Sequence, residues 1–132
     1  MPGDLVLARQ WMAKAHNDLL DAENNLNAAE KPLDTICFHC QQAAEKILKG
    51  FLVSQGCPFP PVHDLLLLLE KVTGFSSEAE KLRDSLALLN PYAVEVRYPD
   101  DCFMPALTDA QEAKSAADKV LAWAKRTNPG LF

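Results

Sequence analysis

The residues best equipped for chemistry form one polar block, in which His39, Gln42, Lys46 and Lys49 follow one another at spacings of three, four and three residues. In a helix these spacings place the four side chains on one side. Imidazole can carry protons, an amide can donate and accept hydrogen bonds, and ammonium groups can neutralise phosphate. The alternative is a solvated helix face, on which Glu45 and Lys49 form an ordinary surface ion pair. Spacing alone leaves both interpretations open.

A Cys-x-x-Cys pair, Cys37 and Cys40, lies in the same segment with His39 between its two thiols. A zinc site needs four converging ligands, usually as two close pairs, and this chain offers one close pair inside a predicted helix. A redox pair of this kind belongs to a strand–helix–strand unit, which the sequence does not predict. Cysteine also packs well as a small apolar residue. We therefore expect no metal site, and reduced thiols.

A glycine-rich phosphate loop is absent from the sequence. The glycines are Gly3, Gly50, Gly56, Gly74 and Gly130. A phosphate loop needs clustered glycines at a helix start, so that backbone N–H groups can close on the anion. The serines lie in predicted caps or helices, and none has the sequence of a nucleophile elbow around it. The sequence therefore predicts no catalytic residue and no cofactor, and a nucleotide site would have to be built from side chains.

Helical periodicity runs through almost the whole chain and predicts five helices in a single domain, residues 1–132. An apolar seam from Leu5 to Ala29 recurs at alternating spacings of three and four, which is typical of a bundle helix. The predicted helices are residues 4–29, 34–55, 63–73, 77–89 and 109–126. Two long N-terminal helices, two shorter helices and one long C-terminal helix indicate an all-α, five-helix up-and-down bundle.

Capping patterns set the expected helix ends. Asp34 is a good N-cap residue for the second helix, and Gly56 can adopt the left-handed conformation that closes it. Residues 77–80 and 108–111 both have capping-box spacing, which predicts the starts of the fourth and fifth helices. The first and last helices carry wide faces of small residues. These faces favour a core contact, with a dimer interface as the second interpretation.

Composition narrows the class of protein. The 132 residues are 48% hydrophobic and 23% charged, which is typical of a globular chain, and 13 Lys and Arg against 18 Asp and Glu give a net charge of −5. An acidic chain is a poor general binder of nucleic acid, but one local basic site remains open. Charges among the first twenty residues leave no signal peptide, and the longest run of large apolar residues is Leu65–Leu69. We therefore expect a cytoplasmic protein without membrane contact.

The polar block belongs to an ordered set of motifs that resembles the HEPN domain family (higher eukaryotes and prokaryotes nucleotide-binding domain). The likeness covers nearly the whole chain, in order and with compatible spacing. It consists of Trp11, Ala15, Asp18 and Leu19, the run Phe38-His39-Cys40-Gln41-Gln42-Ala43-Ala44-Glu45-Lys46 with Lys49, then Gly56, His63-Asp64-Leu65 and Arg97-Tyr98-Pro99. No single motif is specific, whereas the ordered set is.

The resemblance implies an all-helical bundle, commonly a homodimer, whose short prokaryotic members are often encoded beside a minimal nucleotidyltransferase in a toxin–antitoxin-like pair. Some members are ribonucleases that use an Arg and a later His with four to six residues between them. Arg97 occupies the plausible position here, but no histidine lies between Tyr98 and Leu107. The one literal match, Arg9 with His16, lies on the first helix, and we interpret it as coincidence.

We therefore predict a non-catalytic, homodimeric HEPN-type module that acts with a nucleotidyltransferase partner, with a nucleotide or RNA as the expected ligand. The candidate binding residues are His39, Gln42, Lys46, Lys49, His63, Arg97 and Tyr98. Lys46, Lys49 and Arg97 would meet phosphate. His63 lies at a helix start, and Tyr98 would stack on a base. Structural roles for the same residues, a divergent toxin-like ribonuclease and a plain dimeric scaffold stay open as alternatives.

Overall fold

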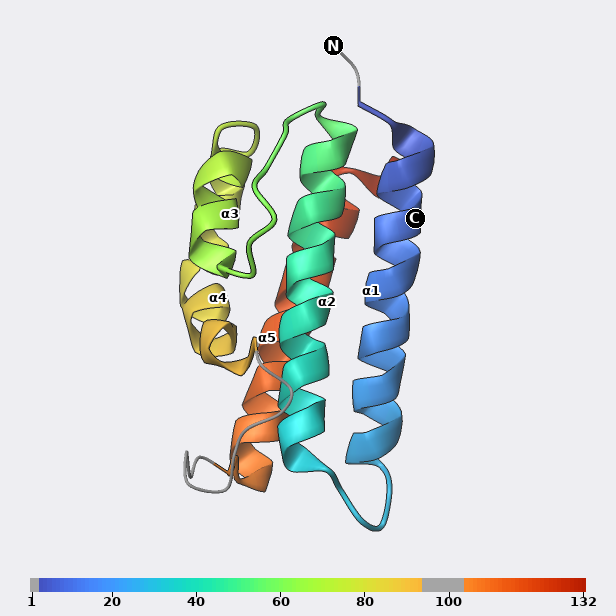
Figure 1. Ribbon diagram of the computed structural model, residues 1–132, viewed down its shortest axis with the longest axis vertical. Helices are drawn as coiled ribbons and strands as arrows, with labels where there is room; N and C mark the ends of the chain where they lie inside the picture. Colours follow the sequence, from blue (N-terminus) through green and yellow to red (C-terminus); the bar gives the residue numbers. More distant parts are fainter. Residues whose placement is uncertain (1–2, 94–103) are drawn as a thin grey trace.

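The computed structural model describes residues 3–93 and 104–132, which form α-helices and short 3-10 helices without a strand. The α-helices are α1 (Leu5–Leu26), α2 (Leu33–Ser54), α3 (Leu65–Thr73), α4 (Arg83–Leu89) and α5 (Leu107–Thr127). The 3-10 helices are η1 (Ser77–Leu82), η2 (Asn90–Tyr92) and η4 (Pro129–Leu131). The predicted all-α bundle of five helices is confirmed. Figure 1 shows α2 running antiparallel to α1, with α3 and α4 along its other side.

The tight pairing of α1 with α2 explains the small residues of the first apolar seam. Ala8, Ala15 and Ala22 of α1 are fully or almost fully buried. On the side of α2 that faces α1, a Cβ on Gly50 would lie 2.9 Å from Trp11 Cβ, closer than real Cβ atoms come. Asp4 caps α1 by accepting a hydrogen bond from the Leu7 N–H at 3.0 Å. Because small residues face each other, the two helix backbones can pack side by side along most of their length (Figure 1).

The alanine-rich face of α5 lies inside the bundle. Its buried residues include Ala110, Ala113, Ala116, Ala117 and Ala124. α5 packs mainly on α2 and α4, and the Trp123 ring lies 4.9 Å, between centroids, from that of Phe51. The core contact is therefore the correct interpretation of this face, because its alanines are buried within one copy of the chain.

Both predicted capping boxes are wrong. The segment from Ser77 begins as the 3-10 helix η1 and receives no side-chain cap, because the Glu80 carboxylate turns to the Arg83 guanidinium instead. α5 begins at Leu107, ahead of the predicted start, and there the Asp109 carboxylate accepts from the Ala106 N–H at 2.8 Å. At the start of η1, the Glu80 carboxylate therefore binds a charged side chain in place of a backbone N–H. At the start of α5, Asp109 accepts the hydrogen bond from the N-cap N–H, a role that the sequence had predicted for Gln111.

The connection after α2 positions the rest of the site. Gly56 has φ 67°, as its predicted role at the helix end requires. Asp34 lies in the first turn of α2 and not at the N-cap, which is Pro32. α3 begins two residues later than predicted, at Leu65, because Asp64 is its N-cap.

Within the described residues, no helix has the length and apolar character needed to cross a membrane.

Candidate functional site

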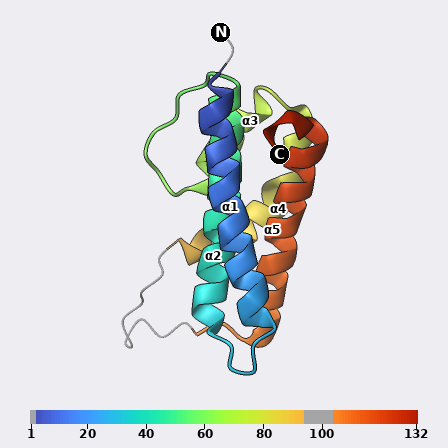
Figure 2. The ribbon, with the colours of Figure 1, turned by 90° about the vertical axis from the view of Figure 1, so that its right-hand side faces the viewer.

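The polar block of α2 divides between two buried carboxylates. α2 lies in the middle of the bundle, so that α1 covers part of its polar face and the connection to α3 covers another part (Figures 1 and 2). Asp18 of α1 binds the groups on one side, and Glu45 of α2 binds those on the other. We call these groups of hydrogen-bonded residues the Asp18 network and the Glu45 network.

The Asp18 network joins α1 to α2 through charge. The Asp18 carboxylate accepts the Lys46 ammonium at 2.6 Å through Oδ2, and its Oδ1 lies 2.8 Å from His39 Nδ1. His39 Nε2 lies 3.6 Å from an Asp21 carboxylate oxygen on the next turn of α1. Asp21 in turn accepts from the Asn25 side-chain amide at 2.8 Å. Asp18 is only 7% exposed, so these partners provide the compensation that a buried carboxylate requires.

The Glu45 network joins α2 to the connection before α3. Glu45 Oε2 accepts the Lys49 ammonium at 3.1 Å, and Oε1 lies 2.9 Å from His63 Nδ1. Because an ionised carboxylate can only accept, His63 Nδ1 donates and Nε2 is left as the acceptor of the neutral ring. The Gln41 amide donates to the His63 carbonyl at 3.1 Å, and the Gln42 amide donates to Gln41 Oε1 at 2.7 Å. The network thus fixes one tautomer of an imidazole whose side chain is 66% exposed.

The Lys49 ammonium is enclosed by aromatic rings as well as by Glu45. Its Nζ lies 5.9 Å from the centroid of the Trp11 ring and 5.7 Å from that of Phe59. Both rings attract a cation electrostatically. Lys49 is 6% exposed and Glu45 is 4% exposed. The expectation of an ordinary surface ion pair is therefore wrong, because side chains from α1 and from the connection after α2 cover the pair.

The N-terminus of α3 has its backbone donors occupied. The Asp64 carboxylate accepts from the N–H groups of Leu66 and Leu67, and the side-chain oxygen Oδ1 of Asn90 accepts from that of Leu65 at 2.9 Å. Asn90 also donates to Asp64 at 3.1 Å. An anion beside His63 would have to compete with the Asp64 carboxylate for these donors, so the imidazole itself is the better contact point.

Most of the predicted binding residues lie close together in the structure, and they form hydrogen bonds with other side chains of the same chain. His39 and Lys46 belong to the Asp18 network, whereas Gln42, Lys49 and His63 belong to the Glu45 network. Arg97 and Tyr98 lie outside the described residues.

The prediction omitted the groups that organise both networks, which are Asp18, Glu45 and Gln41. One signal was available: cations on a helix with apolar residues on both sides need buried acceptors. Across the described residues, no buried polar side-chain atom lacks a hydrogen-bond partner.

The cysteine pair lies in the core. Cys37 and Cys40 are fully buried, and they are free thiols together with Cys57. Burial raises the pKa of Cys37 to about 11 and that of Cys40 to about 12, which makes both thiols poor nucleophiles near neutral pH. The described residues contain no group of three or more His, Cys, Asp or Glu arranged to hold a metal ion. Cys102 lies outside the described residues.

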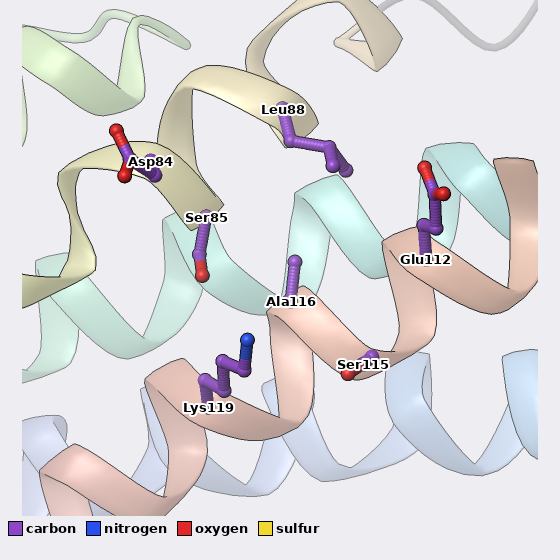
Figure 3. Close-up of a pocket in the computed structure, with 7 residues that line it drawn as sticks. All are labelled: Asp84, Ser85, Leu88, Glu112, Ser115, Ala116 and Lys119. Atoms are coloured by element: carbon purple, nitrogen blue, oxygen red, sulfur yellow. The ribbon is translucent and has the colours of Figure 1, made fainter.

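A shallow hollow between α4 and α5, shown in Figure 3, contains none of the predicted site residues. It has a volume of about 230 Å³ and is lined by Asp84, Ser85, Leu88, Glu112, Ser115, Ala116 and Lys119. The carboxylates of Asp84 and Glu112 lie at opposite ends, with Lys119 reaching in from α5. Its mixed charges and small volume favour no particular ligand.

Comparison with known proteins adds one finding. The family model of the HEPN domain matches residues 8–127, which spans α1 to α5 and includes both networks. No match was found among curated proteins or among solved structures.

Proposed function

This chain belongs to the HEPN domain family, and from that premise we propose that it is a non-catalytic helical module that forms a homodimer, acts with a minimal nucleotidyltransferase and binds a nucleotide or RNA. The observation that supports the non-catalytic part of the proposal is the internal pairing of the polar block. Lys46 bonds to Asp18 and Lys49 to Glu45, while His39 lies between two carboxylates. Side chains held in this way tie helices together, and they are poorly placed to move protons on a substrate.

His63 is the proposed point of contact with the ligand. Its side chain is largely exposed, and the Glu45 carboxylate orients the ring through Nδ1. A fixed imidazole at the surface is a suitable hydrogen-bond partner for a phosphate or a base. By family likeness, Arg97 and Tyr98 would add a guanidinium and an aromatic ring. The net charge of −5 supports one small anionic ligand or a short RNA over an extended nucleic acid.

A thermal-shift screen tests the ligand. The protein is heated separately with ATP, GTP, their diphosphates and a short RNA. A ligand that binds only the folded state raises the free energy of unfolding by about 2.7 kcal/mol when its concentration is a hundredfold above Kd. The shift should shrink in His63→Gln and in Arg97→Ala, and should persist in Lys81→Gln, which alters an exposed lysine on η1. A flat response to every ligand would contradict the binding part of the proposal.

The partner and the dimer require separate measurements. The nucleotidyltransferase part rests on family likeness, and its test is co-purification with the product of a neighbouring nucleotidyltransferase reading frame. Failure of the two proteins to co-purify would count against it. Sedimentation at micromolar concentration tests the homodimer, and a monomer there would remove it.

The plain dimeric scaffold is the second candidate, because the same internal pairing gives the polar block a purely architectural role. A dimer that shows no thermal shift with any nucleotide or RNA would favour the scaffold over the binding module. The third interpretation, a divergent ribonuclease, requires RNA degradation that depends on Arg97. Degradation at the wild-type rate in Arg97→Ala would eliminate that mechanism.

A further inference from the structure

A groove beside α1 carries positive charge in a protein that is negative overall. It lies between the N-terminal half of α1 and the turn η4, on the opposite side of α1 from the connection that holds His63 (Figure 2). Its lining residues are Arg9, Met12, Ala13, His16, Leu131 and Phe132. The volume of about 370 Å³ lies within the range of roughly 300–1,000 Å³ that is typical of small-molecule sites.

The floor of this α1–η4 groove is apolar and its wall is an exposed ring. Met12 and Leu131 are 4% and 2% exposed and form a packed floor, whereas Phe132 is 51% exposed. Ala13 is exposed between them and leaves space above the floor, because its side chain is only a methyl group. An apolar body could lie there without burying a polar group of the protein.

The polar side chains that line the groove are those of Arg9, which is cationic, and His16. The Arg9 Nε–H donates to the Gly130 carbonyl at 3.1 Å, which holds the guanidinium at the groove and leaves its terminal N–H groups available. Within residues 3–93 and 104–132, neither Arg9 nor His16 forms an ion pair, and no acidic residue lines the groove. Lys125 adds a further positive charge, with its Nζ 5.6 Å from the centroid of the Phe132 ring.

We propose that the α1–η4 groove binds a small organic anion that has an apolar body. Arg9 meets the anionic group, for which its forked donors are well suited, and His16 supplies a second donor. These two residues lie seven positions apart, or about 10 Å along the helix, so that the apolar body rests on the floor between them. Aliphatic or aromatic carboxylates and organic phosphates share this chemistry. The inference is independent of the function proposed above, whose described contact point, His63, lies in the connection on the other side of α1 (Figure 2).

Two other hollows among the described residues lack this complementarity. The hollow between α4 and α5 has a carboxylate at each end. The one beside the connection after α2 has a single charged residue, Asp4, which would repel an anion.

Fluorescence titration with 8-anilinonaphthalene-1-sulfonate, an aromatic sulfonate, tests the groove in the full chain. Arg9→Gln should weaken binding of this probe about tenfold, since it removes a charge-assisted contact, and His16→Gln should weaken it less. Ala13→Phe should block binding by filling the space above the floor. All three positions are exposed, so the helix signal in circular dichroism should stay at the wild-type level.

Two controls distinguish recognition of the anionic group from nonspecific hydrophobic binding of the probe. Lys14→Gln removes the same charge from the same helix at an exposed position that does not line the groove, and should leave the affinity unchanged. The uncharged analogue N-phenyl-1-naphthylamine should bind wild type and Arg9→Gln equally, because it keeps the apolar body alone.

Competition then identifies the natural chemistry. Displacement of the sulfonate by decanoate indicates an aliphatic carboxylate, and displacement by phenyl phosphate indicates an organic phosphate that is not a nucleotide. The proposal is overturned if the sulfonate does not bind, if it binds Arg9→Gln as tightly as wild type, or if neither competitor displaces it.

Discussion

Glu45 and Lys49 form a charged pair inside the bundle, four residues apart on α2. Removing a carboxylate and an ammonium from water is unfavourable, and their mutual attraction compensates only when the remaining hydrogen-bonding capacity is also used. Here His63 binds the second oxygen of Glu45, and two aromatic rings face the ammonium. The pair is therefore a poor source of net stability, but each partner has become indispensable to the other.

The substitution Glu45→Gln should destabilise the fold by about 3 kcal/mol, because it leaves the Lys49 charge buried without a counter-charge. Urea denaturation followed by circular dichroism measures the loss. The double variant Glu45→Gln/Lys49→Met should recover most of it, since the uncompensated cation is gone. As a control, Glu78→Gln alters an exposed pair with Lys81 and should leave the midpoint unchanged. A single Glu45→Gln variant as stable as wild type would contradict the role given to this network.

At the scale of helices, the contact between α1 and α2 depends on Gly50. Alanine would normally favour a helix by about 1 kcal/mol over glycine. At this position, however, its Cβ would lie 2.9 Å from Trp11 Cβ and 3.1 Å from Met12 Cε. Gly50→Ala should therefore destabilise the protein by about 1–3 kcal/mol, which is the usual range for overpacking. Thermal unfolding is the measurement. Gly130→Ala is the control, because its nearest contact would be an ordinary 3.6 Å. Equal melting temperatures for Gly50→Ala and wild type would contradict this, since α1 and α2 would then accommodate the added methyl group without a loss of stability.

The start of α3 offers a second test of an element. Asp64 caps two backbone N–H groups and also accepts from Asn90, so Asp64→Ala should lower the free energy of unfolding by about 1–2 kcal/mol. The matched control is Asp34→Ala in the first turn of α2, where the carboxylate accepts only from the adjacent Thr35 N–H. We expect a smaller loss for this control in the same denaturation experiment. A larger loss at Asp34 would restore the N-cap that the sequence had predicted there.

The contrast between these two acids shows what the sequence could predict. The existence of all five helices follows from apolar periodicity, because burying one face of each helix dominates the energetics. The first residue of each helix was harder to predict, since several nearby side chains can accept hydrogen bonds from the same backbone N–H groups. At η1 the decisive partner, Arg83, lies outside the capping motif altogether. Arg83 is also paired with Glu70 of α3, a partner from another helix that no local pattern includes.

At the scale of the whole molecule, the same limit applies to the candidate site. Spacing on α2 correctly grouped His39, Gln42, Lys46 and Lys49 on one helix, but it could not say what faces them. Asp18 approaches from α1 and His63 from the connection before α3, both distant in sequence. The block is partly buried, and Lys49 is its most buried member. The packing of three segments gives these side chains internal partners, which spacing on one helix could not reveal.

The packed interior also predicts how stability should depend on alkaline pH. Burial raises the pKa of Cys37 from 9.0 to about 11, against an opposing hydrogen bond with Tyr92, and raises that of Cys40 from 9.0 to about 12. Burial, followed by the charge of Cys37, raises the pKa of Tyr92 from 10.0 to about 12. The folded state therefore keeps protons that the unfolded chain releases above pH 9. Stability should be complete below pH 9 and decline as pH rises through 11.

Urea denaturation at pH 7, 8.5 and 10.5, with a reductant present, measures this decline. The expected result is little change between the first two conditions and a clear loss at the third, because most thiols of the unfolded state ionise only above their ordinary pKa of 9.0. The variant Cys37→Ala/Cys40→Ala removes both thiols from the core and should show a shallower dependence on pH, whatever its stability at pH 7. The comparison is therefore between slopes and not between absolute stabilities. An unchanged slope in the double variant would mean that groups other than this cysteine pair govern the alkaline transition.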